Sequence, residues 1–142
     1  MYREHPLIAV IDDDTAYVDM MREVLTDEGY QVICCLNGRE AQMMIREQKP
    51  DLAILDIRLE DFVSGWEILE LMRRVPATKD MPLMVCSADA QFLHSHVDQL
   101  REYRCQVLEK PFMLSELFAK IQAGISSTAP DSSEPLGVAN GS

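Results

Sequence analysis

The 142-residue sequence has no long apolar run, and its first residues carry no signal-peptide pattern. A membrane-spanning helix needs about 20 consecutive apolar residues. A secretory signal needs a basic start, an apolar stretch and a small-residue cleavage site. We therefore expect a cytoplasmic protein without a membrane partner.

Positive charge is scarce, with 13 basic against 24 acidic residues and a net charge of −11. A chain this acidic repels phosphate backbones, so we expect no nucleic-acid partner. The densest basic clusters, Arg73 with Arg74 and Arg101 with Arg104, are too thin to reverse that repulsion. We expect both to be solvated helix ends, where cations complement the helix dipole.

Spacings typical of metal or disulfide frameworks are absent. None of the four cysteines forms a CxxC pair, so we expect reduced thiols that pack as small hydrophobes. His94 and His96 are two apart on a predicted helix, and residues two apart do not face one ligand. The sequence also lacks a GxxxxGK[ST] loop, a GxGxxG turn after the first apolar run, and a Ser/His/Asp set at strand ends.

Five short apolar runs alternate with helical patterns, and the hydrophobic fraction of 47% is enough for a buried core. The predicted strands are 7–11, 32–36, 52–55, 83–86 and 106–108. The predicted helices are 15–28, 39–49, about 66–72, 90–101 and 114–125. This alternation predicts an α/β fold, an open doubly wound five-stranded parallel sheet that binds ligands at the carboxyl ends of its strands.

The composition changes after about residue 126 to a stretch rich in serine and proline. Such a stretch has little to bury. We expect one folded domain at 1–126 and a disordered C-terminal tail at 127–142.

Carboxylates, a hydroxyl and a lysine follow the predicted strands. The residues are Asp12, Asp13 and Asp14 after the first strand, Asp56 after the third, Ser87 after the fourth and Lys110 after the fifth. Two carboxylates about 4 Å apart repel by about 4 kcal/mol at an effective dielectric of about 20, so this edge must take up a proton or a cation. Hard oxygen ligands favour Mg²⁺, and a lysine opposite them suits a phosphoryl oxygen.

Each residue also has a plainer interpretation. Asp14 is better explained as a helix cap. Asp56 alone could be a turn residue, Ser87 could cap the next helix, and Lys110-Pro111 could be an ordinary turn. The ordered set on four strands is what favours the phosphoryl interpretation.

This ordered set resembles the receiver domain of two-component response regulators. The matching segments are 10–14, 50–58, 87–88 and 110–112, and the resemblance covers about residues 7–125. It implies a flavodoxin-like (βα)5 fold with strand order 2-1-3-4-5.

The resemblance also implies roles for individual residues. Asp56 would accept a phosphoryl group from a sensor histidine kinase or a histidine phosphotransfer protein. Mg²⁺ would be bound by Asp13, Asp56 and the backbone carbonyl of Arg58, with Asp12 acting largely through water. Lys110 would pair with the phosphoryl group, and its bond to Pro111 would be cis.

The switch implied by the family comprises Ser87, Ala88 and Val107, with the Ser87 hydroxyl turning toward the phosphoryl group. Two features depart from the family pattern. Val107 stands where an aromatic residue is common, so the output would depend less on an aromatic rotamer or would use Tyr103. The loop 59–65 lacks the usual proline and is one residue longer.

We therefore expect a single-domain, Mg²⁺-dependent response regulator that is not an enzyme and has no enzymatic output domain. It would signal to a downstream protein through the face near 90–118, or relay its phosphoryl group. One alternative is a receiver-like scaffold that acts without phosphorylation. The other is a phosphatase of the haloacid-dehalogenase type with Asp12 as nucleophile and Asp14 as acid, but Ala16 stands where that family has Thr or Val, and a cap domain has no room.

Overall fold

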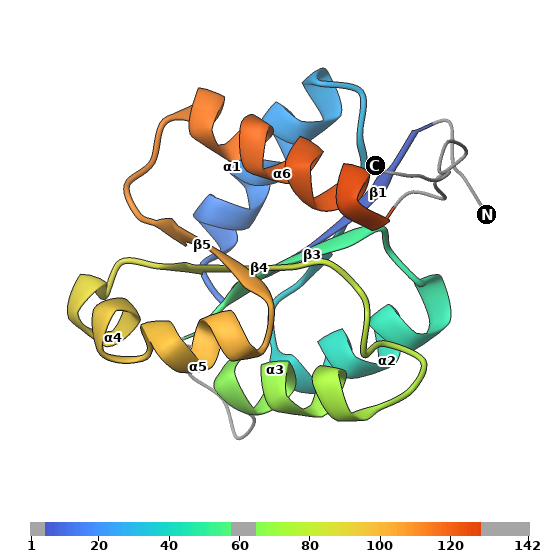
Figure 1. Cartoon of the computed structure of the whole chain (residues 1–142). Coiled ribbons are helices and arrows are strands. Elements are labelled where there is room, and N and C mark those ends of the chain that lie inside the picture. Colours follow the sequence, from blue (N-terminus) through green and yellow to red (C-terminus); the bar gives the residue numbers. More distant parts are fainter. Residues whose placement is uncertain (1–4, 58–64, 129–142) are drawn as a thin grey trace, which may run out of the picture.

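A computed structural model describes residues 5–57 and 65–128, which form a five-stranded parallel sheet between two layers of helices (Figure 1). The strand order is β2-β1-β3-β4-β5, as predicted. The strands are β1 (Leu7–Ile11), β2 (Gln31–Cys35), β3 (Leu52–Asp56), β4 (Leu83–Ser87) and β5 (Cys105–Glu109). None of the described helices is long and apolar enough to cross a membrane.

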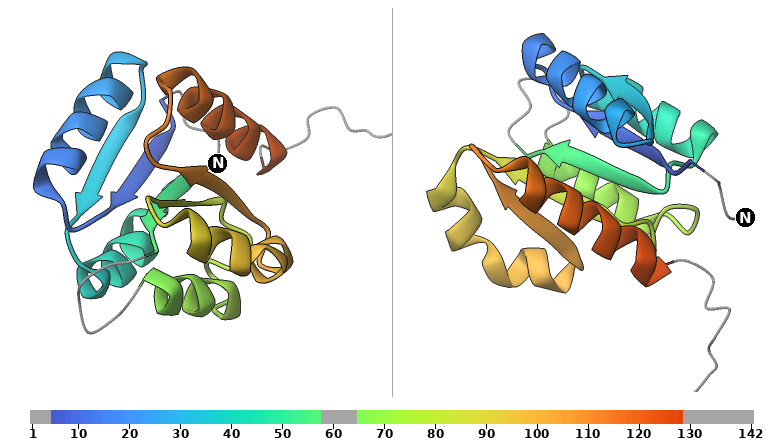
Figure 2. Two further views of the ribbon diagram at one scale, coloured as in Figure 1. Left: turned by 90° about the vertical axis from the view of Figure 1, so that its left-hand side faces the viewer. Right: turned by 90° about the horizontal axis from the view of Figure 1, so that it is seen from above.

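Helices cover both faces of the sheet, as the two further views in Figure 2 also show. One face carries α1 (Thr15–Asp27) and α6 (Leu114–Thr128). The other carries α2 (Gly38–Gln48), α3 (Gly65–Arg74), α4 (Ala90–Ser95) and α5 (Val97–Glu102). Helix α6 continues two residues past the predicted domain boundary, and residues 129–142 of the predicted tail lie outside the described residues.

The inner strands explain why the apolar runs are continuous. All five residues of β1 are buried. Ile8 and Val10 pack in the core on the α1 side, whereas Ala9 and Ile11 pack in the core on the opposite side. A strand buried on both faces cannot alternate apolar with polar residues.

The register of the sheet determines where the polar residues meet. Ile11, the last residue of β1, pairs with Leu55 of β3. Asp56 in turn pairs with Cys86 of β4. The residues that follow β1 and those that end β3 and β4 therefore lie at one edge of the sheet.

The cap at the start of α1 confirms a further prediction. The Asp14 carboxylate accepts the backbone N–H groups of Ala16 and Tyr17, at 3.1 and 3.2 Å, and so caps α1. Gly29 follows the end of the same helix with φ of +96°, a conformation that favours glycine.

One helix prediction was wrong. The segment 90–101 is not continuous, because it breaks at His96 into α4 and α5. Side-chain groups gather at the last turn of α4, where Ser95 Oγ donates to the Phe92 carbonyl at 3.0 Å and His96 Nδ1 lies 2.9 Å from the same oxygen. Such side-chain bonds compete with the helical pattern. His96 is also half buried, since its ring stacks on Phe92 with centroids 4.0 Å apart.

The cysteines behave as predicted. Cys35 and Cys86 are buried, Cys34 and Cys105 are half buried, and all four are free thiols. Burial raises the pKa of Cys105 to about 11 and that of Cys35 to about 12. These two thiols therefore stay protonated at neutral pH, where a reactive thiolate would be needed for metal or redox chemistry.

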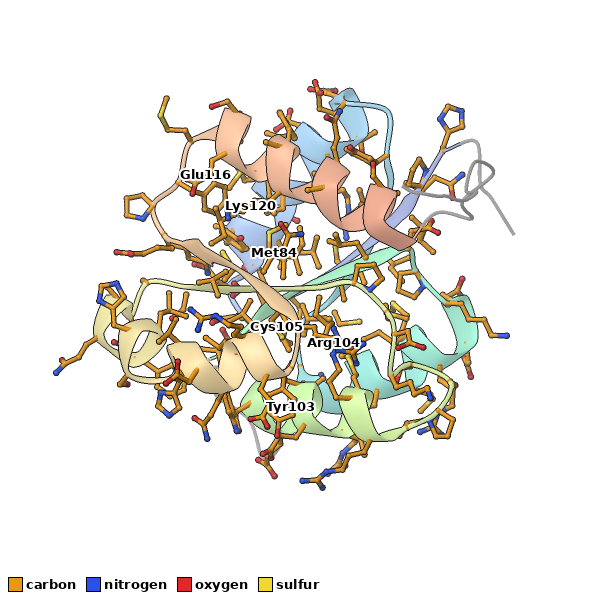
Figure 3. All side chains as sticks on the ribbon, viewed as in Figure 1. Met84, Tyr103, Arg104, Cys105, Glu116 and Lys120 are labelled. Carbon is orange, nitrogen blue, oxygen red and sulfur yellow. The ribbon has the colours of Figure 1, made fainter. Side chains whose placement is uncertain are left out.

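The expectation that Arg73 is a solvated helix end was also wrong. Its Nε donates to the Tyr103 carbonyl at 2.7 Å, and its Nη1 donates to the carbonyls of Lys79 and Met81 at 3.0 and 2.8 Å. Burial lowers the pKa of this guanidinium. Arg73 thus joins α3 to the start of β5, where Figure 3 shows Tyr103 and Arg104 at the turn that leaves α5.

We predict that Arg73→Ala lowers the free energy of unfolding by about 2–4 kcal/mol, because three backbone carbonyls lose a charged donor. Arg73→Lys should not restore stability, since a lysine cannot reproduce the planar donor set. Urea denaturation measures the change. Arg74→Ala, at the exposed neighbouring position, is the matched control and should change stability by less than about 0.5 kcal/mol. Equal losses in the two variants would contradict this role.

Candidate functional site at the acidic edge of the sheet

Three carboxylates meet where β1 and β3 end. One oxygen from each of Asp12, Asp13 and Asp56 lies within 4.8 Å of the other two. Asp12 is buried and Asp56 is half buried. The structure thus brings together the three acidic residues that the sequence predicted, and we call this group the acidic cluster.

Asp12 forms a nearly buried ion pair across the edge. Its Oδ2 accepts a hydrogen bond from Lys110 Nζ at 2.8 Å, and its Oδ1 accepts the Asp14 N–H at 3.0 Å. The Asp12 side chain is 2% exposed and that of Lys110 is 20% exposed. A pair this buried is strongly coupled, and removing either partner would leave an uncompensated charge.

Lys110 keeps its charge. Burial by itself would lower the pKa of its ammonium, but the hydrogen bond and charge of Asp12, followed by the charge of Asp56, outweigh burial and raise it. The Lys110–Pro111 bond is cis, as predicted, and the Lys110 N–H donates to the Ser87 carbonyl at 2.8 Å. Lys110 is therefore positively charged, and its charge interacts with those of both Asp12 and Asp56.

Ser87 is buried at the end of β4, and its hydroxyl has a local role. Its Oγ accepts the Asp89 N–H at 3.0 Å, and the Asp89 carboxylate caps α4 by accepting the Phe92 N–H at 3.0 Å. The alternative that Ser87 caps the next helix is wrong, because Asp89 is the N-cap of α4. Ser87 accepts the N–H of that capping residue, which links its hydroxyl to the first turn of α4.

Gly65 places α3 directly against the end of β3. A Cβ at this position would overlap the backbone of Asp56 and Ile57, and would lie 2.7 Å from the Ile57 Cα. Only glycine permits so close an approach. The predicted ligand Arg58 and residues 59–64 of the predicted atypical loop lie outside the described residues.

The remaining predicted switch residues lie on β5 and directly after β4. Val107 lies half buried in β5 and packs against the core on the α3 side. Ala88 lines a hollow of about 440 Å³ beside Lys110, and Tyr17, Met20, Pro111, Phe112 and Leu114 complete its lining.

The sequence did not reveal that Tyr17 contacts Lys110. Its ring centroid lies 3.9 Å from Lys110 Nζ. Its helical spacing predicts only a core position, and no motif marks it as part of the site. The one sequence feature that could point to a role for Tyr17 is its position, one helical turn after the acidic residues 12–14 and on the helix that begins at the acidic cluster.

Comparison with known proteins gives the family. Residues 8–122 match the family model described as the response regulator receiver domain. The chain belongs to this receiver family. It is 33% identical over 126 residues to the phosphate regulon transcriptional regulatory protein PhoB of Rhizobium meliloti, covering 89% of this chain and 55% of that protein.

A second curated relative is also a response regulator. The response regulator MprA of Mycolicibacterium vanbaalenii is 34% identical over 125 residues, covering 87% of this chain and 52% of that protein. The chain thus spans about half the length of these two curated relatives. A CheY-like receiver domain protein from Methanospirillum hungatei has the same fold, with a TM-score of 0.78, 24% identity, and coverage of 87% of this chain and 96% of that one.

The donor set of this receiver fits Mg²⁺. Receiver domains bind Mg²⁺ at an acidic pocket, and here three hard carboxylates converge. Lys110 offsets one of their charges, so the four groups together still carry a net negative charge. Asp14, whose carboxylate caps α1, is not part of the cluster.

We predict that Asp13→Asn and Asp56→Asn each raise the free energy of unfolding by about 1–2 kcal/mol in EDTA, because either change removes repulsion within the acidic cluster. Adding Mg²⁺ should stabilise the native protein and should stabilise these variants much less. Thermal unfolding with and without Mg²⁺ measures both effects. Asp19→Asn, at an exposed acidic position on α1, is the control and should leave the response to Mg²⁺ unchanged. A native protein that Mg²⁺ does not stabilise would contradict the metal site.

Proposed function

We propose that this receiver accepts a phosphoryl group on Asp56, in a reaction that depends on Mg²⁺, from a sensor histidine kinase or a histidine phosphotransfer protein. The observation that carries the proposal is the position of Asp56, which shares the acidic cluster with Asp12 and Asp13 and whose charge acts on Lys110. Phosphoryl transfer needs in-line positioning and charge neutralisation, and this arrangement supplies groups for both.

In the proposed reaction an Asp56 carboxylate oxygen attacks phosphorus, and the bond from phosphorus to the donor's imidazole nitrogen breaks. The products are an acyl phosphate on Asp56 and a free histidine on the donor. Bound Mg²⁺ would neutralise charge on the phosphoryl oxygens, held by Asp13 and Asp56, with Asp12 beside them and the Arg58 carbonyl as a further ligand. Lys110 would exchange its contact with Asp12 for one with a phosphoryl oxygen.

The conformational change that follows phosphorylation would begin at Ser87. When its hydroxyl turns to donate to the phosphoryl group, it releases the Asp89 N–H that it accepts in the present structure. Asp89 caps α4 through Phe92, so the first turn of α4 would shift. Ala88 and Val107 would adjust with it, as residues next to Ser87 and on the neighbouring strand.

The movement would reach an aromatic group between α3 and α4. Phe92 packs edge-on against Trp66, with centroids 5.9 Å apart. Trp66 also contacts His96 and Tyr103, at 5.3 and 6.0 Å. This group offers an aromatic path to the surface although Val107 replaces the usual aromatic residue of β5, and it includes the Tyr103 that the sequence suggested.

The output would be a protein contact through α4, α5 and the segment up to about residue 118, or onward relay of the phosphoryl group. We propose that the receiver acts in the cytoplasm through such contacts and that the receiver itself has no nucleic-acid partner. The relatives PhoB and MprA are about twice as long. For the phosphatase alternative, Asp14 would have to serve as the acid, yet its carboxylate is held by the N-terminal N–H groups of α1.

The direct test of phosphoacceptance uses beryllium fluoride, which imitates a phosphoryl group on a carboxylate. With Mg²⁺ it should shift amide resonances near Asp56, Ser87 and Val107 in the native protein. Asp56→Asn should abolish these shifts, while Asp19→Asn should keep them. A native protein whose spectrum does not change would favour the scaffold that acts without phosphorylation.

We also predict that Trp66, the only tryptophan in the chain, changes its fluorescence when beryllium fluoride and Mg²⁺ bind. Ser87→Ala should reduce that change more than it reduces binding, because the link from the hydroxyl to Asp89 and Phe92 is lost. Ser115→Ala removes an exposed hydroxyl from α6, on the opposite face of the sheet, and should leave the response in place. An undiminished response in Ser87→Ala would contradict the proposed path.

A further inference from the structure

Tyr17 is held at three points around Lys110. It lies in the first turn of α1, and its hydroxyl is 3.5 Å from Cys86 Sγ on β4. Its ring meets the ring of Phe112 edge-on, with centroids 6.5 Å apart and an interplanar angle of 86°. Helix α1, strand β4 and the loop after β5 thus fix the orientation of the Tyr17 ring.

The Lys110 ammonium lies over this fixed ring, 3.9 Å from its centroid. A lysine carries its charge on a flexible four-carbon stem with several rotatable bonds. Its ion pair with Asp12 anchors the ammonium on one side, and the Tyr17 ring supports it on another. An aromatic face attracts a cation through the ring quadrupole and needs no single hydrogen-bond direction.

This difference matters when a phosphoryl group arrives. Lys110 must then leave Asp12 Oδ2, so the ion pair cannot guide it through the change. The Tyr17 ring can guide the lysine, because a cation attracted to an aromatic face keeps most of that attraction when it moves sideways by a short distance. Burial also raises the pKa of Tyr17 far above its usual range, so the ring remains a neutral phenol.

We propose that Tyr17 is a positioning residue, which holds the Lys110 ammonium beside the acidic cluster and keeps it there as the lysine moves from Asp12 to the phosphoryl group. Tyr17 acts through Lys110 and not on the reacting atoms. The role in transfer rests on the proposed function, whereas the effect on the position of the ammonium does not.

The plainer interpretation is that Tyr17 is an apolar residue of the α1 core with a lysine nearby. The two interpretations differ in what a substitution should do. Tyr17→Phe keeps the ring and loses only the contact to Cys86. Tyr17→Leu keeps an apolar side chain but removes the aromatic face.

The first experiment measures the position of the lysine without any phosphoryl donor. In the NMR spectrum the ε-methylene protons of Lys110, assigned by their absence in Lys110→Met, should be shifted upfield by the ring current of Tyr17. Tyr17→Phe should keep the upfield shift and Tyr17→Leu should abolish it. A Lys110 methylene signal at an ordinary lysine position in the native protein would overturn the inference.

The second experiment measures transfer from acetyl phosphate with saturating Mg²⁺. Tyr17→Leu should slow phosphorylation by about 5- to 30-fold, the range that a partly buried cation–π contact allows, and Tyr17→Phe should recover most of the rate. In a Lys110→Met background Tyr17→Leu should have no further effect, since the lysine through which it acts is gone. Circular dichroism and urea unfolding establish that each variant is folded.

The control is Met20→Leu, because Met20 lies on the same helix and lines the same hollow. It should leave the rate unchanged. Equal slowing by Tyr17→Leu with and without Lys110 would overturn the inference and leave phosphoacceptance intact. A native chain that takes up no phosphoryl group would overturn the proposed function and the role of Tyr17 in transfer together.

Discussion

The structure depends on one electrostatic constraint, which is the crowding of three carboxylates at the end of two adjacent parallel strands. Oxygens of Asp12, Asp13 and Asp56 lie within 4.8 Å of one another, and Lys110 forms an ion pair with Asp12. Two like charges about 4 Å apart repel by about 4 kcal/mol at an effective dielectric of about 20, and the charge of Lys110 offsets part of that repulsion here. A fold that retains this arrangement gives up stability at its functional edge, and a bound cation would recover it.

The rest of the fold keeps that edge in place. The doubly buried β1 and its register with β3 set Asp12 beside Asp56. Gly65 lets α3 begin against the backbone of Asp56. The cis bond before Pro111 and the N–H bond to Ser87 fix the backbone of Lys110, while the Tyr17 ring supports its side chain. Ser87 and Lys110 are thereby connected, since the Ser87 carbonyl at the end of β4 accepts the Lys110 N–H.

Much of this could be predicted from the sequence, for a physical reason. Strands covered on both faces are continuous apolar runs, and the residues that follow parallel strands must meet at one edge. That rule was enough to place Asp12, Asp13, Asp56, Ser87 and Lys110 together. The strand order and the roles of these residues came from the family resemblance, and the comparisons confirm the family.

What the sequence did not reveal depends on contacts between distant segments. Arg73 was expected in solvent because nothing near it in the chain shows that the Tyr103 carbonyl, 30 residues away, is its partner. The break at His96 comes from side chains that bond to the Phe92 carbonyl and stack on its ring, which periodicity does not register. Tyr17 fits an ordinary helical stripe, and only the loop after β5, which brings Lys110 over its ring, gives it a second role.

The central claim is that Asp56 takes the phosphoryl group, and intact-mass spectrometry tests it most directly. After incubation with a small-molecule phosphoryl donor and Mg²⁺, the native chain should gain the mass of one phosphoryl group, and hydroxylamine, which cleaves acyl phosphates, should remove it. Asp56→Asn and a reaction in EDTA should show no gain. A native chain that gains no mass, or a gain that persists in Asp56→Asn, would contradict the account.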